Sequence, residues 1–157
     1  AWMQGSLELG PRALGHRSLL GDPRSLHVRD RLNIIKKREA WRPIAPAIIE
    51  SKKEYCNLQK ASEYMTNTIK MNVLAIDEIP GGCHVDNSAR VQLVRKDAGR
   101  FYDLIRLFER ITGIPAVLNT SLNGKNEPIC TTIEDGVKFF FTTPTDSLII
   151  DHWRFKK

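Results

Sequence analysis

The chain has 157 residues, of which 41% are hydrophobic and 27% are charged, and its formal net charge is +6. This length predicts one domain over residues 1–157, large enough to bury roughly two-thirds of the surface that its unfolded chain exposes. The apolar fraction excludes a disordered polyampholyte, and the apolar stretches are too short for a membrane helix. Three cysteines without Cys-x-x-Cys spacing argue against a disulfide framework or a structural zinc site. We expect a cytoplasmic domain, and its first residues, Ala-Trp-Met-Gln, suggest that it was cut from a longer protein.

The first third of the chain predicts a loop, a helix and a strand. Residues 5–22 are expected to form a loop, because glycines interrupt any regular period. Ser25 is a candidate N-cap for a helix that should end near Arg38. The apolar face of this helix consists of Val28, Leu32 and Ile35. Residues 44–50, an apolar run rich in Ile and Ala, predict a buried strand.

The rest of the chain alternates between strand and helix patterns. Further strands are predicted at residues 64–71, 89–94, 116–118 and 147–150, with a turn at 80–82. The clearest helical stripe covers residues 101–111, and Gly113 should end that helix in the left-handed conformation. Thr131 and Glu134 have capping-box spacing and predict the start of a last helix. Interleaved strands and helices predict an α/β (or α+β) sheet domain.

Positive charge is concentrated between residues 10 and 42. This stretch holds nine cations and three anions, and nine minus three equals the whole net charge of +6. Seven of the nine cations are arginine, whose guanidinium forms paired hydrogen bonds with phosphate or carboxylate. The pattern indicates an anionic partner, such as a phosphorylated small molecule, a nucleotide or a nucleic acid. A solvated basic helix face would explain it equally well.

Three polar, irregular segments adjoin predicted regular structure, at residues 10–18, 36–43 and 118–124. In the first, glycines on both sides of Arg12 let the backbone approach a ligand closely, although such turns are common on surfaces. In the second, cations gather at a helix end, which the helix dipole alone would explain. In the third, a polar loop leaves a buried strand where open α/β sheets bind ligands, although Asn123-Gly124 is also an ordinary turn pair.

Four ordered segments resemble the C-terminal region of the O-carbamoyltransferase family, which includes nodulation protein U and antibiotic carbamoyltransferases. The segments are Gly10–Ser18, Lys36–Pro46, His84–Gln92 and Leu118–Asn123. The resemblance implies the YrdC-like fold, a twisted mixed β-sheet flanked by helices. It also implies that the domain takes carbamoyl phosphate and ATP, with Mg²⁺ accompanying the nucleotide, and forms carbamoyl-adenylate. A preceding N-terminal transferase domain, which binds iron in the family, would move the carbamoyl group onto a hydroxyl of a small-molecule acceptor.

The resemblance also implies roles for particular residues. The expected catalytic residues are Lys36, Arg42, Arg90 and Ser121. The expected substrate- and nucleotide-binding residues are Arg12, Arg38, Asn119 and Asn123. No metal site is expected in this chain, and Asn87-Ser88 stands where relatives often have Gly-Thr. The alternatives are a basic nucleic-acid-binding module and a non-catalytic module that docks the N-terminal domain, and a homodimer stays open.

Overall fold

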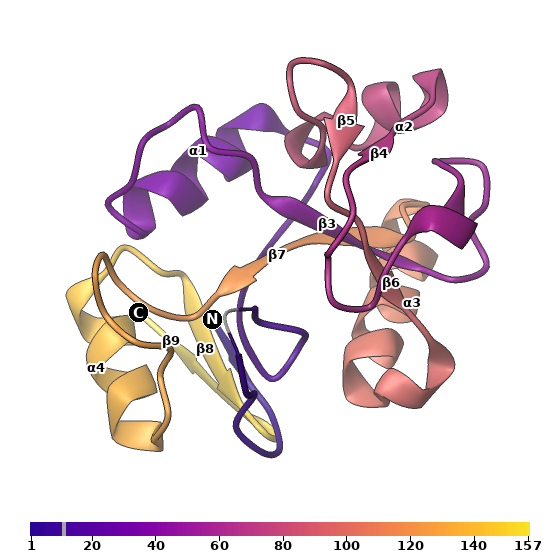
Figure 1. Ribbon diagram of the computed structural model, residues 1–157. Coiled ribbons are helices and arrows are strands. Elements are labelled where there is room, and N and C mark those ends of the chain that lie inside the picture. The colour runs from indigo at the N-terminus through magenta and orange to yellow at the C-terminus, as the bar shows by residue number, and fades with distance from the viewer. Residues whose placement is uncertain (11) are drawn as a thin grey trace.

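The computed structural model describes residues 1–10 and 12–157, so Pro11 of the first motif lies outside the described residues. A seven-stranded mixed sheet with the order β6-β3-β7-β2-β1-β8-β9 forms the centre of the fold, and helices flank it (Figure 1). The strands are β1 (Trp2–Met3), β2 (Arg17–Gly21), β3 (Ala45–Ile49), β6 (Gln92–Val94), β7 (Ala116–Ser121), β8 (Ser147–Ile150) and β9 (Trp153–Lys156). The β3–β6 and β1–β8 pairs are parallel and the other pairs are antiparallel, which confirms the predicted mixed sheet.

Four α-helices and a small second sheet complete the structure described here. The helices are α1 (Leu26–Ile35), α2 (Val73–Glu78), α3 (Arg100–Thr112) and α4 (Ile133–Thr142), with 3-10 turns η1 (Leu58–Lys60), η2 (Pro80–Gly82) and η3 (Lys96–Ala98). Strands β4 (Ile69–Lys70) and β5 (Ser88–Ala89) pair with each other outside the main sheet. No helix within residues 1–10 and 12–157 combines the length and apolar composition needed to cross a membrane.

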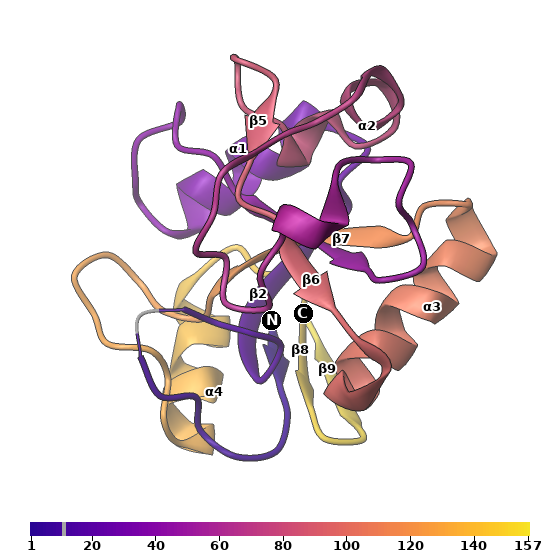
Figure 2. The ribbon, with the colours of Figure 1, turned by 45° about the vertical axis from the view of Figure 1, so that its right-hand side comes forward.

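Three apolar clusters hold these layers together. Phe101 and Ile105 of α3 pack against Val117 of β7 and the neighbouring strand β3. Helices α1 and α4 share a second cluster with β2 and β8, in which Leu32 and Phe139 are buried. The segment from η1 to β6 covers the other side of β3 with the third cluster. Figure 2 shows α3 and α4 on opposite sides of the central strands.

Two predicted helices are confirmed, with one shift in length. Ser25 caps α1 by accepting a hydrogen bond from the backbone N–H of His27, but the helix ends at Ile35 rather than near Arg38. Lys37 has a φ of +49°, a left-handed conformation that a continuing helix does not allow. Gly113 ends α3 with a φ of +80°, as its position predicted.

Several element boundaries differ from the sequence prediction because strand pairing decides them. The predicted loop at residues 5–22 contains β2, which pairs with both β1 and β7 despite its flanking glycines. The polar residues after Leu118 continue β7 to Ser121 instead of forming a loop. The predicted strands 64–71 and 89–94 shrink to β4 and to the separate strands β5 and β6. The capping box uses Thr132 and Asp135, one residue later than predicted.

Candidate anion-binding site

Five segments far apart in the sequence meet around a pocket of about 150 Å³, here called the arginine pocket. They are the loop before β2, the turn after α1, the segment before β4, the link between β5 and β6, and the end of β7. The lining residues are Arg12, Ala13, Arg38, Pro43, Ile44, Ala45, Met65, Arg90, Asn119, Thr120 and Ser121. Five residues predicted from the sequence therefore share one pocket, namely Arg12, Arg38, Arg90, Asn119 and Ser121.

The arginines of the arginine pocket form no ion pair with a carboxylate of the described residues, although the more distant charge of Glu39 partly offsets that of Arg38. In the described part of the chain, no Asp or Glu oxygen lies within 4.0 Å of the guanidinium groups of Arg12, Arg38 or Arg90. Burial lowers the pKa of Arg90, and the charge of Arg12 lowers it further. Burial and then the charge of Arg42 likewise lower the pKa of Arg38. Because these neighbouring like charges repel one another and are partly removed from water, an anion at the pocket would compensate them.

Two polar atoms at this pocket are buried and have no hydrogen-bond partner among the described residues. Nη2 of Arg38 is one of them, although Nε of the same side chain donates to Asn33 Oδ1 at 2.6 Å. The other is Oδ1 of Asn119, whose amide nitrogen donates to the carbonyl oxygen of Ala13 at 2.9 Å and to Gln92 Oε1 at 2.7 Å. One orphaned donor and one orphaned acceptor at the same pocket match a ligand that has both an anionic oxygen and an N–H group.

Lys36 and Asn123 lie beside the arginine pocket rather than in its lining. Lys36 Nζ donates to the backbone oxygen of Ser121 at 2.6 Å and to Asn123 Oδ1 at 2.7 Å. The Ser121 hydroxyl also donates to Asn123 Oδ1, at 2.7 Å. Burial, and then the charge of Arg38, lowers the pKa of Lys36 to about 7, whereas hydrogen bonds to several oxygens favour the ammonium form. Lys36 therefore fixes the end of β7, where Ser121 enters the pocket.

Arg42, predicted as catalytic, is not among the lining residues of the arginine pocket. It is exposed and forms an ion pair with Glu39, with Nε 3.4 Å from Oε2. Its effect on the pocket in this structure is electrostatic, through the lowered pKa of Arg38.

The loop that carries Arg12 is held by side chains from outside it. The Glu8 carboxylate accepts hydrogen bonds from the backbone N–H groups of Leu14, His16 and Arg17. The carbonyl oxygens of residues 13–15 are bonded in turn by Asn119, by Gln92 and by the indole N–H of Trp2. These bonds leave the backbone of residues 13–17, which follows Arg12, little freedom.

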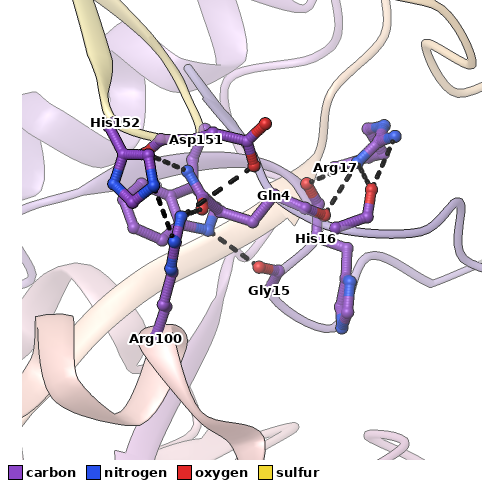
Figure 3. A network of polar contacts seen from close by, with 9 residues as sticks. Gln4, Gly15, His16, Arg17, Arg100, Asp151 and His152 are labelled. Carbon is purple, nitrogen blue, oxygen red and sulfur yellow. Dashed lines mark hydrogen bonds and ion pairs between the residues drawn. The ribbon is translucent and has the colours of Figure 1, made fainter.

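Arg17 belongs to the same motif but supports the loop instead of lining the pocket. Its buried guanidinium donates to the carbonyl oxygens of Gln4, Gly5 and His16, as Figure 3 shows for Gln4 and His16. On the other side of Gln4, Arg100 of α3 donates to the Gln4 side-chain oxygen at 2.9 Å. The network ties the strand β1 region, this loop and α3 together.

A second pocket of about 280 Å³ adjoins the arginine pocket and shares Pro43, Ile44, Ala45 and Arg90 with it. Its other lining residues are Thr68, Gly82, His84, Asp86, Ser88 and Ala89. The Ser88 hydroxyl donates to Asp86 Oδ1 at 2.5 Å, and His84 Nδ1 lies 3.4 Å from the same oxygen. Asn87 adopts a left-handed φ of +61°, which asparagine tolerates better than most residues other than glycine.

Sequence reasoning missed several residues at the two pockets. Met65 lines the arginine pocket with a φ of +55°, a conformation that nothing in its sequence context indicates. Gln92 and Glu8 lie outside both pockets and fix the loop of Arg12 through hydrogen bonds. Of the two, only Gln92, a polar residue inside an apolar strand, stands out in the sequence. Among residues 1–10 and 12–157, no group of three or more His, Cys, Asp or Glu side chains could hold a metal ion.

Three arginines without close carboxylate partners gather where β7 ends, an arrangement that could hold phosphate or carboxylate groups. The chain matches the family described as Carbamoyltransferase C-terminus over residues 1–157, and it belongs to this family. It is 38% identical to nodulation protein NolNO of Sinorhizobium fredii, over 99% of this chain and 24% of that protein. It is 37% identical to the 3'-hydroxymethylcephem-O-carbamoyltransferase of Amycolatopsis lactamdurans, over 98% of this chain and 30% of that enzyme. The chain thus spans less than a third of the length of these relatives.

Proposed function

We propose that this carbamoyltransferase domain binds carbamoyl phosphate and ATP and forms carbamoyl-adenylate for transfer to a hydroxyl of a small-molecule acceptor. The observation that carries the proposal is the convergence of Arg12, Arg38 and Arg90, without carboxylate partners, on one small pocket. Family membership supports carbamoyl transfer as the overall chemistry. The transfer step itself would take place with the N-terminal domain of the longer protein.

The sizes and linings of the two pockets support a division between phosphate and nucleoside. The arginine pocket has about 150 Å³ and three guanidinium groups, which suits carbamoyl phosphate and the reacting phosphate. The adjoining pocket has about 280 Å³, an apolar wall and the polar groups of Asp86 and Ser88, which suits a nucleoside. Arg90 lines both pockets, so we place the α-phosphate of ATP beside it.

The proposed reaction needs positioning and charge stabilisation more than covalent catalysis by the protein. Water cleaves carbamoyl phosphate to phosphate and carbamate, and a carbamate oxygen then attacks the α-phosphorus of ATP. The bond between the α-phosphorus and its bridging oxygen breaks, and pyrophosphate leaves with that oxygen. Fixed guanidinium groups offset the repulsion between the two anionic substrates and the charge that develops on pyrophosphate. The free Oδ1 of Asn119 would accept a hydrogen bond from the carbamoyl NH₂ group.

The distribution of ion pairs favours small anions over a nucleic acid. Within the basic segment, Arg24, Arg29, Arg31 and Arg42 each pair with a carboxylate. The arginine pocket, which gathers arginines without such partners, is too small for a polymer to enter. Mg²⁺ would arrive with ATP, because it is usually held by substrate phosphates and one or two carboxylates, and Asp86 is the carboxylate in the lining of the two pockets.

Isotope exchange between pyrophosphate and ATP tests the proposal. The purified protein should catalyse this exchange only when carbamoyl phosphate is present, because the adenylate must form and revert. Arg90→Met should lower the exchange rate about 100-fold or more, by loss of a group that stabilises the transition state. Arg95→Met is the matched control, since Arg95 pairs with Glu63 outside both pockets. Exchange that is absent, or that is independent of carbamoyl phosphate, would refute adenylate formation.

A further inference from the structure

An apolar groove of about 590 Å³ is larger than both pockets of the candidate site. It lies between α1 and α3 and is edged by β2 on one side and β8 on the other, with Ala1 at its end. None of its lining residues belongs to the arginine pocket or to the adjoining pocket. The groove therefore needs an explanation separate from the proposed chemistry.

The groove begins at the N-terminal end of β1, between β2 and β8, the two strands that pair with β1. Strand β1 has two residues, whereas β2 has five and β8 has four. Trp2 lies opposite Ser18 of β2 and Ile149 of β8. Counting back along this register, residues that precede Ala1 would lie opposite Leu20 and Gly21, which line the groove. The backbone hydrogen bonding between β1 and β8 already extends to Ala1, whose amino group donates to the Ser147 backbone oxygen at 2.7 Å.

The α3 wall of the groove carries apolar side chains that the described part of the chain leaves exposed. Leu107 and Ile111 of α3 line it and are 55% and 83% exposed. On the opposite wall, Val28 and Leu32 of α1 face the same space. Exposed leucine and isoleucine side chains beside an apolar groove give a second polypeptide segment apolar surface to cover.

We propose that the polypeptide that precedes Ala1 in the longer protein fills this groove. It would extend β1 between β2 and β8, opposite Leu20 and Gly21, and then lay apolar side chains across the walls formed by α1 and α3. The relatives supply the argument for this occupant: the chain covers between 22% and 30% of their length and matches the C-terminal part of the family. The groove is thus the place where the rest of the carbamoyltransferase is anchored to this domain.

Cysteine labelling of the longer protein and of this chain alone tests the proposal. Leu107→Cys reports on the groove, and Ile133→Cys on α4 is the matched control, because Ile133 is 57% exposed and lies outside the groove. The native Cys56, Cys83 and Cys130 are buried, so their background labelling is low. We expect the thiol introduced by Leu107→Cys to react at least about tenfold more slowly in the longer protein than in this chain. The thiol introduced by Ile133→Cys should react at a similar rate in both.

A second measurement needs no substitution. Hydrogen exchange of the peptide that contains β2 should be slower in the longer protein than in this chain, because an extended β1 pairs with β2. Equal labelling of the Leu107→Cys variant and equal exchange in β2 would overturn the proposal. Labelling of the Leu107→Cys variant of this chain that slows as its concentration rises would assign the groove to a second copy instead, and would also overturn it.

Discussion

Substitution of Gly15 by alanine tests how tightly the loop that carries Arg12 is packed. Gly15 has a φ of +112°, which residues other than glycine adopt at a cost of roughly 1–2 kcal/mol. An added Cβ would clash with Cδ1 of the Phe101 ring and lie 2.5 Å from its Cγ, and this side chain of α3 is buried in the core. Overpacking of this kind costs about 1–3 kcal/mol, so Gly15→Ala should destabilise the fold by about 2–5 kcal/mol.

Urea unfolding of Gly15→Ala and a matched control separates the two contributions. Gly10 has a similar φ of +98°, but among the described residues other than its chain neighbours, no heavy atom lies within 4 Å of the Cβ that alanine would add. Gly10→Ala should therefore show the backbone cost alone, about 1–2 kcal/mol, with an unchanged dependence on urea. Gly15→Ala should also weaken carbamoyl phosphate binding, because the displaced loop moves Arg12. Equal destabilisation by the two substitutions would refute the packing of Gly15 against Phe101.

Three further outcomes follow from the site and the last helix. Lys36→Met should lower the free energy of unfolding by about 1–3 kcal/mol in urea titrations, because partly buried oxygens of Ser121 and Asn123 lose the hydrogen bonds that Lys36 donates. Arg42→Met should weaken carbamoyl phosphate binding less than Arg38→Met in calorimetry, because Arg42 is paired with Glu39 outside the pocket; a larger loss would restore Arg42 to the site. Hydrogen bonds from the backbone and side chains of Thr132 and Thr131 lower the pKa of Asp135 to about 2. Stability from Asp135 is therefore present above about pH 4 and is lost as the pH falls toward about 2, and acid titration of Asp135→Asn should lack this loss.

Local sequence signals predicted the elements whose stability is local. The apolar stripe of α3 and its terminal Gly113 are visible in the sequence because helix periodicity and the left-handed glycine act within a few residues. The start of α4 shows the limit of such signals. Thr131 and Thr132 each precede an acidic residue by three positions, and only the folded chain selects Thr132 with Asp135.

Strand pairing explains the elements that sequence reasoning missed. Strand β2 forms because β1 and β7 supply partners from both ends of the chain, and its flanking glycines concealed it. The polar end of β7 looked like a loop, although Asn119 and Ser121 are strand residues that turn toward the arginine pocket. Such pairing depends on contacts between distant segments, which periodicity in one segment does not report.

The sequence predicted which residues form the candidate site, and the structure shows where those residues lie. The resemblance to the carbamoyltransferase family implied Arg12, Arg38, Arg90, Asn119 and Ser121, and the structure brings all five to one pocket. Sequence alone could not distinguish Arg42 and Lys36 from the residues that line the pocket. Arg42 forms an ion pair with Glu39 outside the pocket, and Lys36 lies beside it and holds the end of β7. It also gave no indication of Glu8, whose carboxylate organises the loop of Arg12 through backbone N–H groups.

Calorimetric titration with carbamoyl phosphate tests most directly whether the arginine pocket is an anion site. The wild-type protein should bind the ligand, and Arg38→Met should weaken binding about 10- to 100-fold, which corresponds to a charge-assisted hydrogen bond of roughly 1.5–3 kcal/mol. Arg95→Met, which removes an exposed arginine from outside the pocket, should leave the affinity nearly unchanged. Equal affinity of all three proteins, or no binding by the wild type, would contradict the account.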